Sequence, residues 1–389
     1  MLSQVPELPV YPQLPLTLVS GKGSMVFDET GRAYLDMYGG HAVAVTGHCH
    51  PRVVEAITLQ AASLLFYSNA VDIPVRRELC ARLIELGPKN MRAVFLCNSG
   101  AEANENALTL ARLTTGRRKI VSVSGGFHGR TLLTLSLSGI EKYRSLASSE
   151  DGPLFFNKQV LAFGDIAAAA KLIDESCAAL IIEPVQGLAG CVAAEENYLQ
   201  KLREICDHKG VMLVFDEVQC GAGRCGAFTV AQLRGVQPNL ISLAKGLGGG
   251  FPVGAVLADQ AAVDAVRPGD LGSTFGGGPL ACAAALANCN ALVEEGMIEN
   301  AARLGIQLKL GLTGIPGVLK VNGEGLMLGI VLDRAAAAVR DELLRDHDII
   351  AGVSAVPEVL RILPPLNLTT ELADRFVSAL QSVLKKGQS

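Results

Sequence analysis

Lys245 follows a short apolar run and precedes a glycine-rich turn, within the stretch 239–254. Apolar surroundings disfavour the ammonium form of a lysine and lower its pKa. The neutral amine is a nucleophile that attacks carbonyl groups and forms Schiff bases. A single lysine after a strand is more often a solvated side chain with a buried stem. Lys245 therefore indicates catalysis only together with other residues.

Asp216 supplies the second residue of such a site. It closes the continuous apolar run 211–216, which ends 29 residues before Lys245. A carboxylate of this kind keeps the ring nitrogen of pyridoxal phosphate protonated, and the protonated ring is the electron sink that stabilises a carbanion. We therefore predict that Lys245 and Asp216 act together as catalytic residues that hold pyridoxal phosphate.

A third part lies upstream, in the stretch 92–108. Its pattern is typical of a strand, a turn of small residues and then a helix. The free N–H groups and the positive dipole end of such a helix form a binding site for phosphate. The turn at 98–101 is thus a candidate phosphate seat, although Ser99 is also an ordinary helix N-cap.

The bulk properties exclude several classes of function. A chain of 389 residues predicts about two domains. A net charge of −4 gives no reason to expect nucleic acid or an anionic membrane as a partner. No apolar run approaches the roughly 20 residues of a membrane helix. The prolines of residues 1–12 do not fit a signal peptide. We expect a cytoplasmic protein.

The cysteines and histidines do not predict a metal site or disulfides. The ten cysteines include no Cys-x-x-Cys pair, and the six histidines include no His-Glu-x-x-His arrangement. Several cysteines, such as Cys97 and Cys177, fall in or beside apolar segments. Buried free thiols in a reducing compartment are the favoured interpretation.

Strands and helices alternate from about residue 55 onward. The expected strands are 93–97, 119–123, 178–182, 211–216, 240–244 and 253–257, with helices at 100–113 and 198–208. Continuous apolar strands between helices predict an α/β fold with a mostly parallel sheet covered on both faces. Functional residues should then gather beyond the carboxyl ends of the strands.

The remaining segments predict a second, smaller α/β domain. Residues 25–37 have the pattern of a hairpin, with its turn at 29–32. A long alanine-rich helix follows Pro279, and a strand pair at 317–332, a short strand near Val359 and a final helix from Thr370 come after it. We predict an N-terminal segment 1–50 that packs on the small domain, a large domain 51–278 and a small domain 279–389.

One apparent dinucleotide motif is rejected. The letters GAGRCG at 221–226 match Gly-x-Gly-x-x-Gly and follow a strand. Glu217 and Gln219 intervene, however, and no clean helix opens after the glycines. A tight loop beside the cofactor is the preferred explanation.

Five motifs in order reveal a resemblance to a known family. They are NSGAEANE at 98–105, GFHGRT at 126–131, EPVQG at 183–187, FDEVQCG at 215–221 and AKGLGGGFP at 244–252. With them, the chain resembles the class III pyridoxal-phosphate-dependent aminotransferases from about residue 21 to 366. Within the family it is most similar to the acetylornithine type.

The resemblance implies the fold type I of pyridoxal-phosphate-dependent transferases and a homodimer with shared active sites. Lys245 would bind the cofactor covalently and move a proton, and Asp216 would pair with the ring nitrogen. The other cofactor contacts implied are the Ser99, Gly100 and Ala101 turn on the phosphate, Phe127 on the ring face, Gln219 near the ring hydroxyl, and Thr274 of the partner subunit on the phosphate.

The resemblance also implies the substrate contacts and the reaction. Arg130 matches an arginine that grips a substrate carboxylate with its planar fork. Arg361, His41 and Glu183 would complete the substrate site. The amine donor would be an N-acylated ornithine, whose terminal nitrogen passes to 2-oxoglutarate and yields a semialdehyde and glutamate. Acylation keeps that semialdehyde from cyclising.

Two departures from the family bear on specificity. Leu188 stands where a glutamate is usual, and that glutamate pairs with the arginine at the position of Arg361 while the donor reacts. His41 stands where acetylornithine enzymes usually have an aliphatic residue and ornithine aminotransferases a tyrosine. Another acid, such as Glu183 or one of the partner chain, is the alternative partner for Arg361.

Several alternatives to this function remain open at the level of sequence. Another ω-aminotransferase would act on ornithine, 4-aminobutyrate or a carrier-bound lysine precursor. An aminomutase of the same family would turn over without 2-oxoglutarate. A non-catalytic binding protein of this fold is disfavoured because Lys245 and Asp216 are both present.

Overall fold

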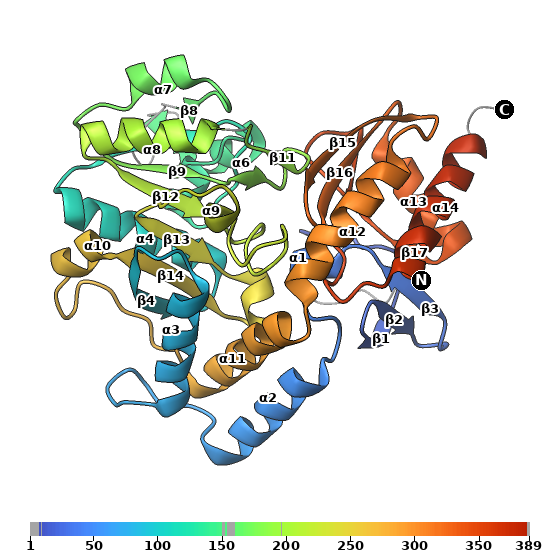
Figure 1. Ribbon diagram of the computed structural model, residues 1–389, viewed down its shortest axis with the longest axis horizontal. Coiled ribbons are helices and arrows are strands. Elements are labelled where there is room, and N and C mark those ends of the chain that lie inside the picture. The colour runs from blue at the N-terminus through green and yellow to red at the C-terminus, as the bar shows by residue number, and fades with distance from the viewer. Residues whose placement is uncertain (1–7, 9, 150–151, 154–159, 196, 387–389) are drawn as a thin grey trace.

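A seven-stranded sheet forms the centre of the larger body in the computed structural model, which describes residues 8, 10–149, 152–153, 160–195 and 197–386 (Figure 1). Its strand order is β4-β14-β13-β12-β9-β5-β8. The strands are β4 Met91–Cys97, β5 Lys119–Val123, β8 Val160–Leu161, β9 Cys177–Ile182, β12 Met212–Asp216, β13 Leu240–Leu243 and β14 Gly254–Asp259. Strand β14 runs antiparallel to both of its neighbours, β13 and β4, and the other neighbouring pairs of this sheet are parallel.

Burial on both faces explains why these strands are continuously apolar. In β12, Leu213 and Phe215 belong to one hydrophobic cluster, whereas Met212 and Val214 face a second cluster built with helix α4, Gly100–Thr115. Side chains alternate along a strand, so Asp216 shares the α4 face with Met212 and Val214. The mostly parallel, doubly covered α/β sheet predicted from the sequence is confirmed.

Helices cover both faces of the sheet. On the α4 side lies α10 Gln260–Ala265, and the opposite side carries α3 Pro74–Leu86, α7 Ile166–Leu172, α8 Tyr198–Lys209 and α9 Val230–Leu233. Helix α11, Pro279–Glu294, packs against α3 and against α2, Pro51–Ser63. It also contacts the 3-10 turn η2, Lys245–Gly248, and this contact matters for the active site.

A smaller body joins the two ends of the chain (Figure 1). One four-stranded sheet contains β15 Val318–Glu324, β16 Met327–Leu332, β19 Val359–Ile362 and β18 Gly352–Val353. Helices α12 Met297–Leu312, α13 Ala336–His347 and α14 Thr370–Lys386 pack with it. A second sheet pairs β1 Leu18–Lys22, β2 Met25–Asp28 and β3 Ala33–Asp36 with β17 Ile349–Ile350. The hairpin predicted at 25–37 is therefore confirmed, whereas the domain boundaries at 50 and 278 remain a proposal.

Short elements connect the rest of the described chain. They are α1 Gly39–Ala42, α5 Leu132–Ser136, α6 Glu141–Arg144, η1 Ser145–Ala147, β6 Ser148–Ser149, β7 Gly152–Pro153, β10 Val185–Gln186 and β11 Val192–Ala193. Within the described ranges, no helix has the length and apolar character needed to cross a membrane.

Candidate active site

The carboxyl ends of β12 and β13 place Asp216 and Lys245 at the same edge of the sheet. The two strands are parallel neighbours, Asp216 is the last residue of β12, and Lys245 comes two residues after β13 ends. A cavity of about 480 Å³ at this edge is lined by both side chains. Parallel strands thus bring together two residues that the sequence separates.

Most of the predicted site residues line this one cavity. The residues it brings together are His41, Gly100, Ala101, Phe127, Arg130, Glu183, Asp216, Gln219, Lys245 and Arg361. Ser99 is not part of the lining but caps α4, where its Oγ accepts a hydrogen bond from the N–H of Glu102 at 3.2 Å. Thr274 lines a separate hollow together with Ser273 and Asn69. Ser99 and Thr274 therefore lie outside the lining of the Lys245 cavity in this chain.

Asp216 is oriented by two buried partners. The Nδ1 of His128 and the Nδ2 of Asn104 both lie within hydrogen-bonding distance of its Oδ2, at 2.8 and 2.7 Å. An ionised carboxylate only accepts hydrogen bonds, so His128 donates through Nδ1–H. The N–H of Val218 donates to Oδ1 at 3.1 Å. The remaining acceptor capacity of Oδ1 suits a cationic N–H donor.

Lys245 is half-buried, and its amine lacks a hydrogen-bond partner among the described residues. Burial lowers the pKa of its amine, against the opposing negative charges of Asp216 and Glu183. Its backbone has φ +44°, in the left-handed region that residues other than glycine seldom adopt. The lowered pKa shifts the amine toward its nucleophilic, neutral form, on a constrained backbone.

The N-terminus of α4 opens into the same cavity. Gly100 and Ala101 contribute the first N–H groups of this 16-residue helix, and these groups have no partner within the helix. A Cβ on Gly100 would lie 2.6 Å from Cγ1 of Val218, so glycine lets the start of α4 approach the loop after Asp216. The helix end offers donors and a positive dipole to an anion.

Glu183 and Phe127 form another part of the lining of the Lys245 cavity. The Oε1 of Glu183 accepts a hydrogen bond from the N–H of Phe127 at 2.6 Å, and its Oε2 accepts one from Gly187 at 3.2 Å. Burial, followed by the negative charge of Asp216, raises the pKa of the Glu183 carboxyl to about 7. Glu183 thus fixes the backbone that carries the Phe127 ring.

Arg130 lies between aromatic rings. Its guanidinium carbon is 5.5 Å from the ring centre of Tyr143 and 6.0 Å from that of Tyr11. Cation–π contacts of this length are attractive and leave the N–H donors of the fork available. No carboxylate among the described residues pairs with Arg130, so a ligand carboxylate can take that position.

Arg361 is buried and held by neutral acceptors. It donates from Nε to the carbonyl of Val353 at 2.8 Å and from its two terminal nitrogens to the Gly187 carbonyl at 3.2 Å and the Tyr38 hydroxyl at 2.7 Å. Within the described part of the chain, none of its partners is an acid. The pKa of nearby His41 is lowered by burial and then by the positive charge of Arg361, which favours a neutral imidazole.

Sequence reasoning assigned no role to several residues of this site. His128 and Asn104 occur in the quoted motifs, but their contact with Asp216 spans 88 and 112 residues of chain. The sequence pattern also gives no indication that Tyr11, Tyr38 and Tyr143 belong to this site. The prolines around Tyr11 indicate an extended segment, but they do not indicate which surface that segment reaches.

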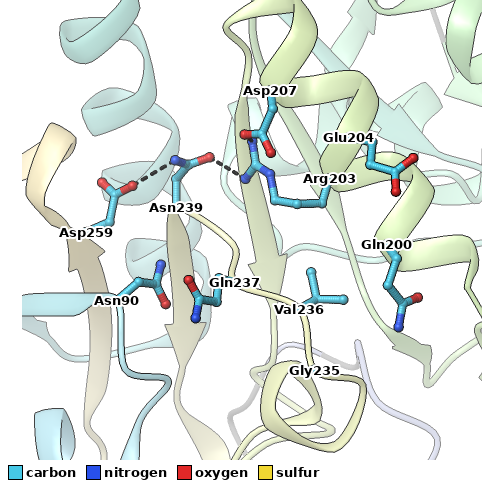
Figure 2. Close-up of a pocket in the computed structure, with 10 residues that line it drawn as sticks. All are labelled: Asn90, Gln200, Arg203, Glu204, Asp207, Gly235, Val236, Gln237, Asn239 and Asp259. Atoms are coloured by element: carbon cyan, nitrogen blue, oxygen red, sulfur yellow. Dashed lines mark hydrogen bonds and ion pairs between the residues drawn. The ribbon is translucent and has the colours of Figure 1, made fainter.

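A second hollow lies at the opposite edge of the sheet (Figure 2). There Asn239, just before β13, donates to Asp259 and accepts a hydrogen bond from Arg203, both at 2.7 Å. These contacts tie the start of β13 to β14 and α8. The hollow contains none of the predicted site residues.

The loop 221–226 does not line the Lys245 cavity. Gly223 and Gly226 have positive φ and lie against α12, where added Cβ atoms would meet Ile298 and Ala302 at 2.9 Å. The tight loop expected from the glycines is therefore present, but it packs between the two bodies instead of beside the cavity.

The cavity has the groups that pyridoxal phosphate requires. A half-buried lysine without a hydrogen bond, a carboxylate with spare acceptor capacity and a helix N-terminus for a phosphate all face one space. The comparison with protein families agrees, because the family Aminotransferase class-III matches residues 9–384. The chain belongs to the class III aminotransferases. Pyridoxal phosphate is its cofactor.

Known proteins similar to this aminotransferase cover nearly its whole length. It is 41% identical over 376 residues to the acetylornithine aminotransferase of Methanopyrus kandleri, which spans 96% of each chain. The crystal structure of acetylornithine aminotransferase from Elizabethkingia anophelis matches with a TM-score of 0.87 at 31% identity, over 97% of this chain and 96% of that one. An ornithine aminotransferase from Toxoplasma gondii, whose structure has partial occupancy of pyridoxal phosphate, matches with a TM-score of 0.89 at 30% identity, over 97% and 93%.

Proposed function

We propose that this aminotransferase moves the terminal amino group of an N-acylated ornithine, such as N-acetylornithine, to 2-oxoglutarate. The products are the N-acylated semialdehyde and glutamate. The reaction has two halves, in which the donor first leaves its nitrogen on the enzyme and the acceptor then removes it. The identity to acetylornithine aminotransferases over nearly the full chain supports this substrate class.

One observation carries the proposal. The cavity that contains the Lys245 amine also contains two guanidinium groups, Arg130 and Arg361, and no described acid pairs with either. Guanidinium groups bind carboxylates in a bidentate manner. The dicarboxylate 2-oxoglutarate can engage both arginines, whereas the donor engages one through its α-carboxylate and presents its terminal amine to Lys245.

The residues of the chain divide the chemistry between them. When bound, pyridoxal phosphate supplies a carbonyl that condenses with amines and a ring that accepts the electron pair left by proton loss. Lys245 Nζ, whose pKa is lowered by burial, takes the proton from the carbon beside the donor nitrogen and returns it. Asp216 Oδ1 stabilises positive charge on the ring nitrogen, and the N-terminus of α4 binds the phosphate.

Further cofactor contacts belong to the same proposal. Phe127 would cover one ring face, and Gln219 would hydrogen-bond near the ring hydroxyl; both line the cavity. His41 stands on the substrate side, near Arg361, where its neutral imidazole contributes shape and a hydrogen bond without charge. Glu183 supports the Phe127 backbone and remains a substrate-site residue in this proposal.

We also propose a homodimer with shared sites. Exposed apolar side chains cluster in the segment after α2 and near Thr274, namely Leu64, Leu65, Phe66, Tyr67 and Phe275. The rings of Phe66 and Phe275 lie 5.0 Å apart, so the two segments form one patch. Covering it with a second copy would remove apolar surface from water and bring Thr274 of the partner subunit toward a phosphate. Sedimentation of the purified protein tests this.

A cytoplasmic location is part of the proposal. All ten cysteines are free thiols, and eight of them are buried. Unpaired cysteines in this number suit a reducing compartment. The location is tested by fractionation of the source cells.

The test of the function is a donor panel with purified protein and pyridoxal phosphate. We expect glutamate to form from N-acetylornithine and 2-oxoglutarate with kcat/KM at least about tenfold above that with ornithine or 4-aminobutyrate, a preference worth ~1.4 kcal/mol. Lys245→Ala should lose all but about a thousandth of kcat, or ~4 kcal/mol. Turnover without 2-oxoglutarate would instead identify an aminomutase.

A further inference from the structure

The backbone at Lys245 requires an external support. Lys245 has φ +44° and starts the 3-10 turn η2, whose preceding residue Ala244 is extended with φ −166°. A residue with a Cβ is disfavoured in the left-handed region, and such a conformation persists only where the surroundings hold it. A 3-10 turn of four residues supplies few hydrogen bonds of its own.

Asn288 of α11 supplies that support. Its Nδ2 donates to the carbonyl oxygens of Gly246 and Leu247 at 2.9 and 3.0 Å. These are the two residues that follow Lys245. The Asn288 side chain is completely buried, so the two hydrogen bonds are shielded from competing water.

Thr46 completes the arrangement from a third segment. Its Oγ1 donates to Oδ1 of Asn288 at 3.0 Å, and it too is completely buried. The carbonyl of Thr46 accepts a hydrogen bond from Asn367 at 3.0 Å. Thr46 belongs to the stretch after β3 that also carries His41. The Lys245 turn is thereby linked to the wall of the substrate cavity.

The shape of the turn depends on the same side chain. Gly249 follows η2 with φ +58°, and a Cβ there would lie 2.6 Å from Oδ1 of Asn288. Helix α11 is otherwise composed mainly of alanine, leucine and cysteine on its buried face. A polar amide in that apolar face is costly unless it is fully bonded, and its bonds go to the Lys245 turn and Thr46.

We propose that Thr46 and Asn288 are positioning residues for Lys245: they hold the left-handed turn that directs Nζ into the cavity. The inference rests on the proposed role of Lys245 as the cofactor lysine. We call the hydrogen bonds of Thr46 and Asn288 the clamp. Without the clamp, the backbone of the turn relaxes toward negative φ, and the Lys245 amine spends less time in the position from which it attacks. The lysine then bonds the cofactor more slowly, while binding of the donor's carboxylate at Arg130 is unaffected.

Two substitutions at Thr46 give the sharpest test. Thr46→Val keeps the side-chain shape and removes the hydroxyl donor, whereas Thr46→Ser keeps the donor. Asn288→Ala removes the whole clamp. Asn300→Ala is the matched control, because Asn300 also donates from Nδ2 to two carbonyls, those of Leu366 and Leu368 at 2.7 and 2.9 Å, but away from Lys245.

The first measurement is the rate at which apoprotein mixed with pyridoxal phosphate acquires the absorbance of the bound cofactor. The second is the fraction of the Lys245 peptide that borohydride traps with cofactor, read by mass spectrometry. We expect both to fall about tenfold in Thr46→Val and Asn288→Ala, to return to within about twofold in Thr46→Ser, and to stay unchanged in Asn300→Ala. With cofactor saturating, kcat should fall while the KM for N-acetylornithine changes less than about twofold.

Two results overturn the inference. If Thr46→Val and Asn288→Ala lower only thermal stability, as we expect of Asn300→Ala, and leave attachment rate and trapping intact, the hydrogen bonds of Thr46 and Asn288 have a structural role alone. If the Lys245→Ala variant still shows borohydride-trapped cofactor, or turns over at a near-native rate, a different lysine holds the cofactor and the assignment of Lys245 fails instead. Should Asn288→Ala not fold, the Thr46 pair still decides the question.

Discussion

His128 Nδ1 lies 2.8 Å from Asp216 Oδ2, with both side chains almost completely buried. Asn104 reaches the same oxygen at 2.7 Å from α4. The two hydrogen bonds fix the plane of the carboxylate. The remaining oxygen is thereby directed at the cavity.

We predict that removing either donor weakens the cofactor site. Hydrogen bonds to charged groups contribute ~1.5–3 kcal/mol, so His128→Ala or Asn104→Ala should raise the Kd for pyridoxal phosphate about tenfold or more. Equilibrium dialysis measures the Kd. His50→Ala is the control, since His50 pairs with Glu295 at 3.2 Å away from the cavity. A cofactor affinity unchanged in both site variants contradicts the assignment.

The lowered pKa of Lys245 predicts how stability depends on pH in the apoprotein. Above the folded pKa and below 10.5, the unfolded chain binds more protons at this amine than the folded chain does. The free energy of unfolding therefore rises with pH because of this group. The contribution of Lys245 to stability is lost as pH falls toward the folded pKa. Relative to Lys245→Met, the wild type should gain stability as pH rises toward 10.5, as measured by urea unfolding.

Lys119 provides the opposite case for comparison. Burial lowers its pKa, but the hydrogen bond to Asp174 at 2.8 Å raises it overall above 10.5. Its stabilising contribution is then complete below 10.5 and is lost only at higher pH. The difference between wild type and Lys119→Met should stay flat over the same range. Parallel curves for both lysine variants would show that burial does not depress the Lys245 amine.

Arg130 should bind the donor's α-carboxylate with support from its two rings. Arg130→Lys keeps the charge but loses the fork, so we expect the KM for N-acetylornithine to rise by one to two orders of magnitude, or ~1.4 to 3 kcal/mol. Tyr11→Ala removes one cation–π contact and should raise KM about twofold to fivefold, while Tyr11→Phe should not. The result that contradicts the assignment is an unchanged KM in Arg130→Lys for every donor with a carboxylate.

The sequence predicts the framework of this site better than its contacts. Strands β9, β12 and β13 are buried on both faces, so their apolar runs are uninterrupted and their carboxyl ends locate Asp216 and Lys245. The strand β8 has two residues, too few for any periodic pattern. Local sequence pattern therefore predicts the long buried strands, whereas a strand as short as β8 is defined only by its pairing within the packed sheet.

The supporting contacts could not be predicted in the same way. Asn288 is recognisable as a polar residue within an alanine-rich helix, but its partners Thr46 and Gly246 are 242 and 42 residues away. Tyr11 reaches Arg130 only because the N-terminal segment crosses to the large body. Such contacts depend on tertiary packing, for which local propensity carries no information.

The last prediction concerns Leu188 and Arg361, which line the same cavity. Glu183, the alternative acid of the same chain, uses its two oxygens on the N–H groups of Phe127 and Gly187. Arg361 is bonded to two carbonyls and the Tyr38 hydroxyl, and no described acid joins them. Leucine cannot accept a hydrogen bond, so the guanidinium stays available to anions during both halves of the reaction.

We therefore expect 2-oxoglutarate to inhibit by occupying Arg361 in the enzyme form that awaits the amine donor. Leu188→Glu introduces a carboxylate that competes for Arg361 and should raise the inhibition constant of 2-oxoglutarate about tenfold, an effect of ~1.4 kcal/mol. Leu188→Met, which adds no charge, should leave it unchanged. Steady-state rates measured across a series of 2-oxoglutarate concentrations give the inhibition constant for the wild type and for each variant. If the glutamate variant is inhibited as strongly as the wild type, Arg361 already has an acidic neighbour, and one from the partner chain becomes the explanation.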